Sequence, residues 1–160
     1  MWGVEQKELM KTTISVFLIS TAAWCADNGV TYWSAGELKG YEKKLAPKVN
    51  QQKVATETLG KYGNSLAMVA HREGDGESEV HGTVADYFVV QSGAAILVTG
   101  GEVEGGRTTQ PNEIRGTAIK GGEKREIGPG DVVYIPAGVP HQLLIAPGGQ
   151  FTYFIVKVEK

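Results

Sequence analysis

GDVVYIPAGVPH, residues 130–141, is the stretch of sequence that decides the fold. Its apolar run from Val132 to Ile135 is typical of a buried strand. Pro136 and Gly138 predict that the strand ends there, because proline lacks the N–H that a sheet ladder needs and glycine tolerates positive φ. The stretch then closes on His141, and this polar residue directly after the turn calls for an explanation.

The chain as a whole has room for one domain with one core. It has 160 residues and a formal net charge of −2, with 16 Lys and Arg against 18 Asp and Glu. The basic residues are scattered among acids, and no aromatic residues are interleaved with a basic stripe. We therefore expect no nucleic-acid partner and no membrane binding through a basic helix.

Residues 10–28, MKTTISVFLISTAAWCADN, have the pattern of a secretory signal peptide. The segment has a charged start at Lys11, an apolar stretch follows, and small residues come after it. The apolar stretch is too short to stay in a bilayer as an anchor. We expect cleavage after Cys25 or Ala26, which makes residues 1–26 a signal peptide or N-terminal extension and the protein secreted or periplasmic.

Two alternatives remain open for this segment. Cys25 would be the acylated residue of a lipoprotein, although Trp24 is bulky where such sites favour a small residue, or the N-terminus is buried or artefactual. Cleavage at or after Cys25 leaves a mature chain without cysteine. That excludes thiolate catalysis and zinc–thiolate sites and suits an oxidising compartment.

The remaining sequence predicts an all-β domain over residues 27–160, with an N-terminal arm and helix in 27–64 and a core barrel in 65–160. Ser34 caps a short helix that Pro47 closes. Short β-rich runs separated by Gly, Pro and Asn then follow at the spacing of an antiparallel sandwich or small barrel. We expect the glycine-rich residues 100–122 to form a surface hairpin or flap.

A second motif lies upstream, in GESEVHGTVADYFVVQSG. Glu79 and His81 are followed by four residues and Asp86, and Gly93 comes six residues later. Together with residues 130–141, this stretch resembles the two motifs of the cupin superfamily. Glutamate stands where the family has its first histidine, and aspartate stands where it has a glutamate.

The resemblance covers about residue 65 to the C-terminus and implies a single antiparallel jelly-roll barrel. It implies a divalent metal ion held by Glu79, His81, Asp86 and His141, a small-molecule ligand, and a homodimer. The fold hosts many unrelated activities, so the resemblance does not name a reaction.

The spacing has a physical reason that does not depend on the family. Alternate strand residues share a face, so Glu79 and His81 project to one side of the sheet. Asp86 returns on the next strand, and the turn at Pro136 and Gly138 aims His141 inward. The alternative is that the histidine is a satisfied polar residue and that the Glu-x-His pair belongs to a solvated edge.

Two carboxylates and two imidazoles would cancel the charge of a divalent ion. Oxygen-rich ligation favours manganese, iron or zinc over copper. Asp86 is one methylene shorter than glutamate. If its carboxylate does not reach the metal, the site keeps three ligands or none.

Several residues surround this predicted site. Phe88 and Val90 share the parity of Asp86 and would form an apolar wall, or would simply be core. His71 is expected to be structural or exposed, and the alternative is that it is a residue of the cavity. Glu77 and Glu113 are acidic candidates for the mouth of the site or for supporting its ligands, and the alternative is that they are solvated.

Three function classes follow. The first is a metal-dependent enzyme acting on a small oxygenated metabolite by dioxygenation, isomerisation or lyase chemistry. The second is a non-catalytic barrel that holds a small ligand or a metal, and the third is a storage or interaction barrel with a relic site. The sequence assigns no lysine, tyrosine or serine as the catalytic acid or base.

Overall fold

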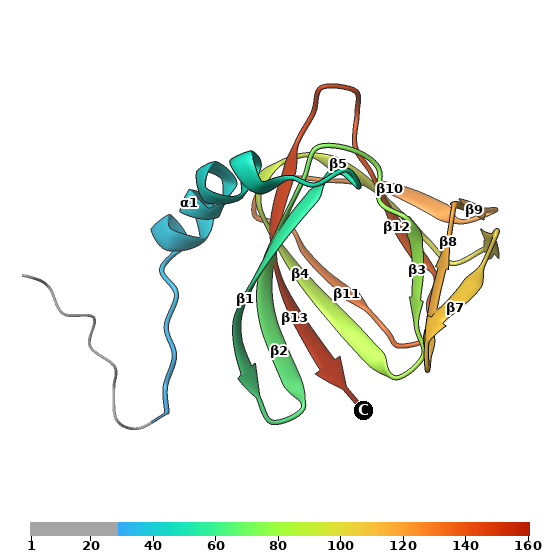
Figure 1. The fold of residues 1–160 in the computed structure, drawn as a ribbon, viewed down its shortest axis with the longest axis horizontal. Coiled ribbons are helices and arrows are strands. Elements are labelled where there is room, and N and C mark those ends of the chain that lie inside the picture. The colour runs from blue at the N-terminus through green and yellow to red at the C-terminus, as the bar shows by residue number, and fades with distance from the viewer. Residues whose placement is uncertain (1–28) are drawn as a thin grey trace, which may run out of the picture. The chain divides into compact units, whose positions relative to one another are not determined.

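The computed structural model describes residues 29–160 (Figure 1). The predicted signal peptide, with Cys25, lies outside the described residues. Residues 33–160 form one compact unit, and residues 29–32, which belong to a separate unit, contain no helix or strand. Within the described part of the chain, no helix has the length and apolar character needed to cross a bilayer.

The unit begins with the predicted short helix. Helix α1 (Ala35–Leu45) starts at Ser34, whose side chain accepts the N–H of Glu37 while the Glu37 carboxylate accepts the N–H of Ser34. Pro47 lies in the short 3-10 helix η1 (Ala46–Lys48) that follows. The expected cap and end are therefore confirmed. Leu45 is 1% exposed and packs with apolar residues of β1 and β2.

The remaining regular elements of the described chain are strands. The strands are β1 (Val54–Tyr62), β2 (Ser65–Arg72), β3 (Ser78–His81), β4 (Val84–Gly93), β5 (Ala95–Thr99), β6 (Glu102–Glu104), β7 (Arg107–Gln110), β8 (Glu113–Gly116), β9 (Ala118–Lys120), β10 (Glu123–Ile127), β11 (Val132–Ile135), β12 (His141–Leu144) and β13 (Phe151–Glu159). This confirms the predicted all-β class with a short N-terminal helix.

The strands form antiparallel sheets. A five-stranded sheet has the order β1-β2-β13-β4-β11, a six-stranded sheet has the order β10-β5-β12-β3-β8-β7, and β6 pairs with β9. The main core lies between the two larger sheets, because its buried residues come from both of them, among them Phe88 and Phe151 from one and Leu97 and Leu143 from the other. The curvature of the sheets around this core is visible in Figure 1.

The glycine-rich segment differs from the prediction. We expected residues 100–122 to be a surface hairpin or flap, and they do contain the antiparallel pair β7 and β8. However, β8 also pairs with β3, with His81 opposite Glu113 and Glu79 opposite Arg115. Strands β7 and β8 are therefore part of the six-stranded sheet, while β6 and β9 form the separate pair, and β8 adjoins the strand that carries two of the predicted metal ligands.

Candidate metal centre

Three of the four predicted metal ligands come together. Glu79 and His81 lie on the short strand β3, and His141 is the first residue of β12, directly opposite Glu79 in the sheet. One ligand atom from each of the three lies within 4.8 Å of the others. Both histidines are 4% exposed, so the cluster is largely withdrawn from solvent. The three side chains lie together because alternate residues of β3 share a face and because β12 pairs with β3 in this register.

The turn before His141 explains the residues that precede it. Gly138 has φ of 83°, which a side chain would strain, and its N–H donates to the carbonyl of His81 at 2.8 Å. The turn is thereby fastened to β3. The carbonyl of Val139 lies 3.1 Å from Nδ1 of His141. The Pro-Ala-Gly turn therefore sets both the position and the ring orientation of the histidine.

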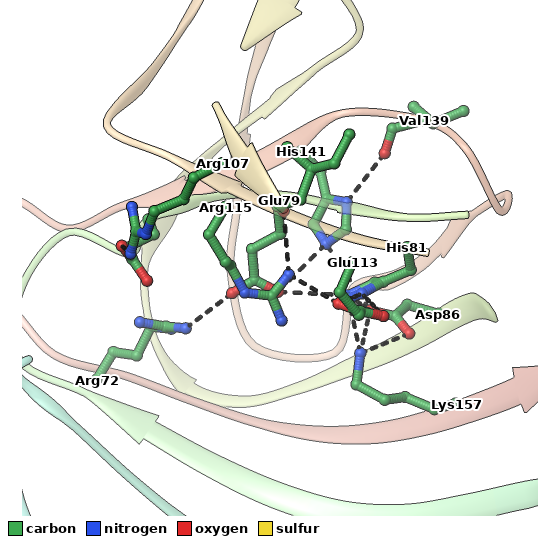
Figure 2. Close-up of polar contacts among 12 residues, drawn as sticks. Arg72, Glu79, His81, Asp86, Arg107, Glu113, Arg115, Val139, His141 and Lys157 are labelled. Carbon is green, nitrogen blue, oxygen red and sulfur yellow. Dashed lines mark hydrogen bonds and ion pairs between the residues drawn. The ribbon is translucent and has the colours of Figure 1, made fainter. Parts of the chain in front are cut away.

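His81 is oriented in a similar way by a carboxylate. Its Nδ1 lies 2.7 Å from Oε2 of Glu113, on the neighbouring strand β8. With Nδ1 engaged in both rings, each Nε2 faces the acids of the cluster (Figure 2). Nε2 of His81 is 3.3 Å from Glu79 and 3.4 Å from Asp86, and Nε2 of His141 is 3.9 Å and 3.8 Å from the same residues. Histidines that bind metals are commonly held in this manner.

Asp86, the fourth predicted ligand, lies beside the other three but is engaged by a lysine. It is 2% exposed, and its carboxylate oxygens lie 2.9 Å and 2.8 Å from Nζ of Lys157. The same Nζ lies 3.1 Å from Nε2 of His81. Sequence reasoning missed Lys157, although a lysine within the apolar run of β13 was a signal. Its register opposite Asp86 places it here.

Two arginines approach Glu79 from different strands, as Figure 2 shows. Arg115 on β8 is 3.0 Å from Glu113 and 3.7 Å from Glu79. Arg72 at the end of β2 is 3.7 Å from the other oxygen of Glu79. The sequence contained no signal for this convergence, because it depends on pairing between strands that are distant along the chain.

The charges fix the protonation of the carboxylates. Burial acts to raise the pKa of Glu79, but the hydrogen bond from His81 and the nearby Arg115 outweigh it and lower that pKa from 4.5 to about 2. Burial likewise acts to raise the pKa of Asp86, and its contacts with His81 and Lys157 lower it overall. Both carboxylates are therefore ionised at neutral pH.

The two histidines are shifted in opposite directions. Burial acts to lower the pKa of His81, yet hydrogen bonds to Asp86 and Glu79 raise it from 6.5 to about 9. Burial lowers the pKa of His141, and that effect prevails. In the absence of a metal, His81 is charged and His141 neutral at neutral pH. The ammonium of Lys157, 3.1 Å from Nε2 of His81, acts to lower the pKa of that ring, but the carboxylates outweigh it.

Two recesses border the cluster. The first is a cavity of about 20 Å³, lined by Arg72, Glu77, Glu79, Phe88, His141, Gln142, Leu143 and Tyr153. The second, about 220 Å³, is lined by His81, Val84, Thr109, Gln110, Glu113, Arg115 and Lys157. Phe88 and Glu77 thus lie at the site. Val90 is 2% exposed in the core and also lines a separate recess with Trp33.

His71 lies outside the cluster. It is fully buried on β2, with Nδ1 2.7 Å from the hydroxyl of Thr152 on β13. The alternative of an exposed His71 is therefore wrong, and the contact is that of a structural residue linking two paired strands.

Comparison with solved structures identifies the fold. The protein TT1209 from Thermus thermophilus has a TM-score of 0.53 at 18% identity, over 73% of this chain and 92% of that one. An uncharacterized conserved protein with a double-stranded β-helix domain from Klebsiella pneumoniae has a TM-score of 0.54 at 17% identity, over 81% of this chain and 90% of that one. The cupin domain of Cnp3 from Schizosaccharomyces pombe has a TM-score of 0.52 at 12% identity, over 71% of each chain.

The chain has the double-stranded β-helix fold of the cupins. No family model and no curated protein matches its sequence. At these identities the similarity establishes the fold alone, and the function must be argued from this chain's own residues.

Proposed function

We propose that this cupin binds a divalent transition metal through Glu79, His81 and His141 and acts on a small oxygenated metabolite. The observation that carries the proposal is the orientation of the two imidazoles. Each has Nδ1 engaged, by Glu113 in one case and by the carbonyl of Val139 in the other, and each turns Nε2 toward Glu79. The cluster is therefore preorganised for an ion.

The donor set fits the metals expected from the sequence. Two imidazole nitrogens and an ionised carboxylate suit manganese, iron or zinc. Asp86 becomes a fourth ligand only if Lys157 withdraws from it, because both of its oxygens contact that ammonium. A bound metal would supply Lewis acidity toward substrate oxygens, as dioxygenation, isomerisation and lyase chemistry require.

The residues of the chain have separate tasks in this proposal. Glu113 and the Val139 carbonyl hold the imidazole rings in place, and Phe88 keeps water from one wall of the small cavity. Tyr153 lines the same cavity, and burial raises the pKa of its hydroxyl, so that it stays protonated and able to donate. It is the candidate proton donor that sequence reasoning did not assign.

A non-catalytic barrel that holds a metal or a small ligand is the second candidate. The size of the cavity beside Glu79 and His141, about 20 Å³, favours it, since that space holds only a water-sized group. Turnover of any candidate metabolite by the metal-loaded protein would separate the two functions.

Export to the periplasm or the exterior is a further part of the proposal, and it rests on the sequence of residues 10–28. Mass spectrometry of the protein from its native host should show a chain that begins near Cys25 or Ala26. A mature chain that retains Met1 or Met10 would contradict export by cleavage.

The decisive experiment compares metal content and melting temperature in three proteins. After loading with manganese, iron or zinc, the wild type should hold about one ion per chain. His141→Ala should lose the metal and still fold, because Pro136 and Gly138 are untouched. His71→Gln is the matched control, since this buried histidine lies outside the cluster, and it should keep the metal even if its melting temperature falls.

Equal metal content in the wild type and His141→Ala would overturn the proposal. The same conclusion follows if the wild type takes up none of the three metals.

A further inference from the structure

Arg72 is a mostly buried cation whose hydrogen-bonding groups are only partly engaged. Its side chain is 13% exposed, and its Nε donates to the hydroxyl of Tyr153 at 3.2 Å. Nη2 lies 3.7 Å from Glu79, which is beyond hydrogen-bond distance. Within residues 29–160, the structure gives the four Nη hydrogens of this guanidinium no hydrogen-bond acceptor. The side chain is still 13% exposed, so these donors are open to water or to a ligand that displaces it.

The small cavity is where such a ligand would bind. Arg72 lines it together with Glu79 and His141, two of the three proposed metal ligands, and with Tyr153. A Cβ at Gly76 would lie 3.1 Å from Nη1 of Arg72, so the glycine leaves one end of the guanidinium uncovered. The Tyr153 hydroxyl accepts a hydrogen from Arg72 and can still donate its own.

Metal binding would leave Arg72 with less counter-charge. Glu79 is the acid nearest to its guanidinium, and Glu79 is shared with Arg115. If Glu79 ligates a divalent ion, its negative charge is committed to that ion. Glu77, the other acid lining the cavity, pairs with Arg107 near the surface. The metal-loaded cavity therefore has an excess of positive charge.

We propose that Arg72 binds the carboxylate of the substrate, which makes the substrate class a small carboxylic acid. The planar guanidinium matches a carboxylate with two parallel hydrogen bonds. The cavity holds little more than the carboxylate itself, which would lie beside Glu79 and His141, while the rest of the acid extends outward past the half-exposed Glu77. The proposal rests on the proposed metal function.

Acetate is the probe, and acetamide is its uncharged counterpart of the same shape. Zinc-loaded wild type should bind acetate in calorimetric titration, in a buffer without carboxylates, and should not bind acetamide. Arg72→Gln should weaken acetate binding by about tenfold or more, because it removes a charge-assisted pair of hydrogen bonds. Arg72→Lys keeps the charge but lacks the planar fork, so it should weaken binding by a smaller factor.

Arg125→Gln is the matched control, because Arg125 is 73% exposed on β10 and pairs with Glu123. Its acetate affinity should equal that of the wild type. Zinc content and melting temperature are measured for every variant. If Arg72→Gln fails to fold or loses zinc, Arg72→Lys decides, and an unchanged acetate affinity in it overturns the inference.

The outcomes separate the two proposals. A wild type that holds zinc but binds acetate no better than acetamide overturns the carboxylate inference alone. So does a folded, zinc-loaded Arg72→Gln with wild-type affinity for acetate. A wild type that takes up no zinc, manganese or iron overturns the metal function and this inference with it.

Discussion

Lys157 places an ammonium group among the residues that would hold the metal. Its Nζ lies 2.8 Å from Asp86 and 3.1 Å from Nε2 of His81. An ammonium and a divalent ion repel each other at such distances, so they compete for these two residues. The lysine thus stabilises the metal-free protein by neutralising a buried carboxylate.

Replacing Lys157 with methionine tests this competition. The variant should bind zinc about tenfold or more tightly, because the competing charge is gone and Asp86 becomes available as a ligand. The metal-free variant should melt at a lower temperature, since the buried carboxylate of Asp86 loses the ammonium that contacts both of its oxygens and keeps only His81 as a cationic partner. Chelator competition and thermal melts with and without zinc measure both effects. Lys124→Met, at an exposed position, is the control, and an unchanged zinc affinity in Lys157→Met would count against competition.

The titration of His81 sets the pH dependence of metal binding. An imidazolium must lose its proton before it ligates, and the pKa of His81 in the metal-free protein is raised to about 9. An unperturbed histidine would instead weaken metal binding as the pH falls through roughly pH 6 to 7. The carboxylates around His81 move that window upward.

We therefore expect the apparent zinc affinity to rise about tenfold per pH unit from neutral pH to about 9 and to level off above it. His141, whose pKa is lowered, adds no dependence in this range. Chelator competition across the range measures the slope, and His71→Gln should show the same profile. An affinity that is already level above about pH 7 would show that His81 titrates normally.

At the scale of elements, strand β8 (Glu113–Gly116) completes the site. It places Glu113 against His81 and Arg115 against Glu79 in one register. Gly116 ends this strand in a space where a Cβ would clash with Val103 and with the Glu104 carbonyl. That Cβ would also lie 2.8 Å from Oγ of Ser78, the residue of β3 opposite Gly116, so the β3–β8 pair leaves no room for a side chain there.

Gly116→Ala should therefore destabilise the protein by about 1–3 kcal/mol, the usual cost of overpacking. It should also weaken zinc binding, because displacement of β8 moves Glu113 away from His81. Gly128→Ala is the control, since a Cβ at Gly128 would meet nothing within 4 Å. Denaturant unfolding and chelator competition measure the two effects. A variant that loses stability while keeping wild-type zinc affinity would show that β8 does not position Glu113.

Local patterns in the sequence predicted the elements that are determined locally. Strand runs, the Ser34 cap and the turn at Gly138 follow from residue type and short spacing. The pairing of β8 with β3 depends on contacts between distant segments. It was not predicted, because the glycines in 100–122 give that segment the composition of a loop. The positions of Lys157 and Arg72 beside the cluster depend on register in the same way, so sequence reasoning found the predicted ligands but not their neighbours.

At the scale of the whole molecule, the outer face of β11 presents apolar side chains. Strand β11 is an edge of its sheet in the part of the chain that the structure describes. Tyr134 on β11 stacks on Tyr87 of β4 with ring centroids 4.8 Å apart, and the two are 51% and 42% exposed. Val132, two residues before Tyr134 and on the same face, is 69% exposed. Edge strands with such a surface are usually covered.

The cupin resemblance implies a homodimer without assigning its interface, and we propose this surface for it. If the homodimer forms through β11, Tyr134→Lys should convert it to a monomer, because two lysines related by symmetry would be buried near each other. Light scattering measures the mass, and the zinc content should not change, since Tyr134 lies outside the cluster. Thr108→Lys, on the edge strand β7 of the other sheet, is the control and should remain dimeric. A monomeric wild type would contradict the homodimer, and a dimeric Tyr134→Lys would place its interface elsewhere.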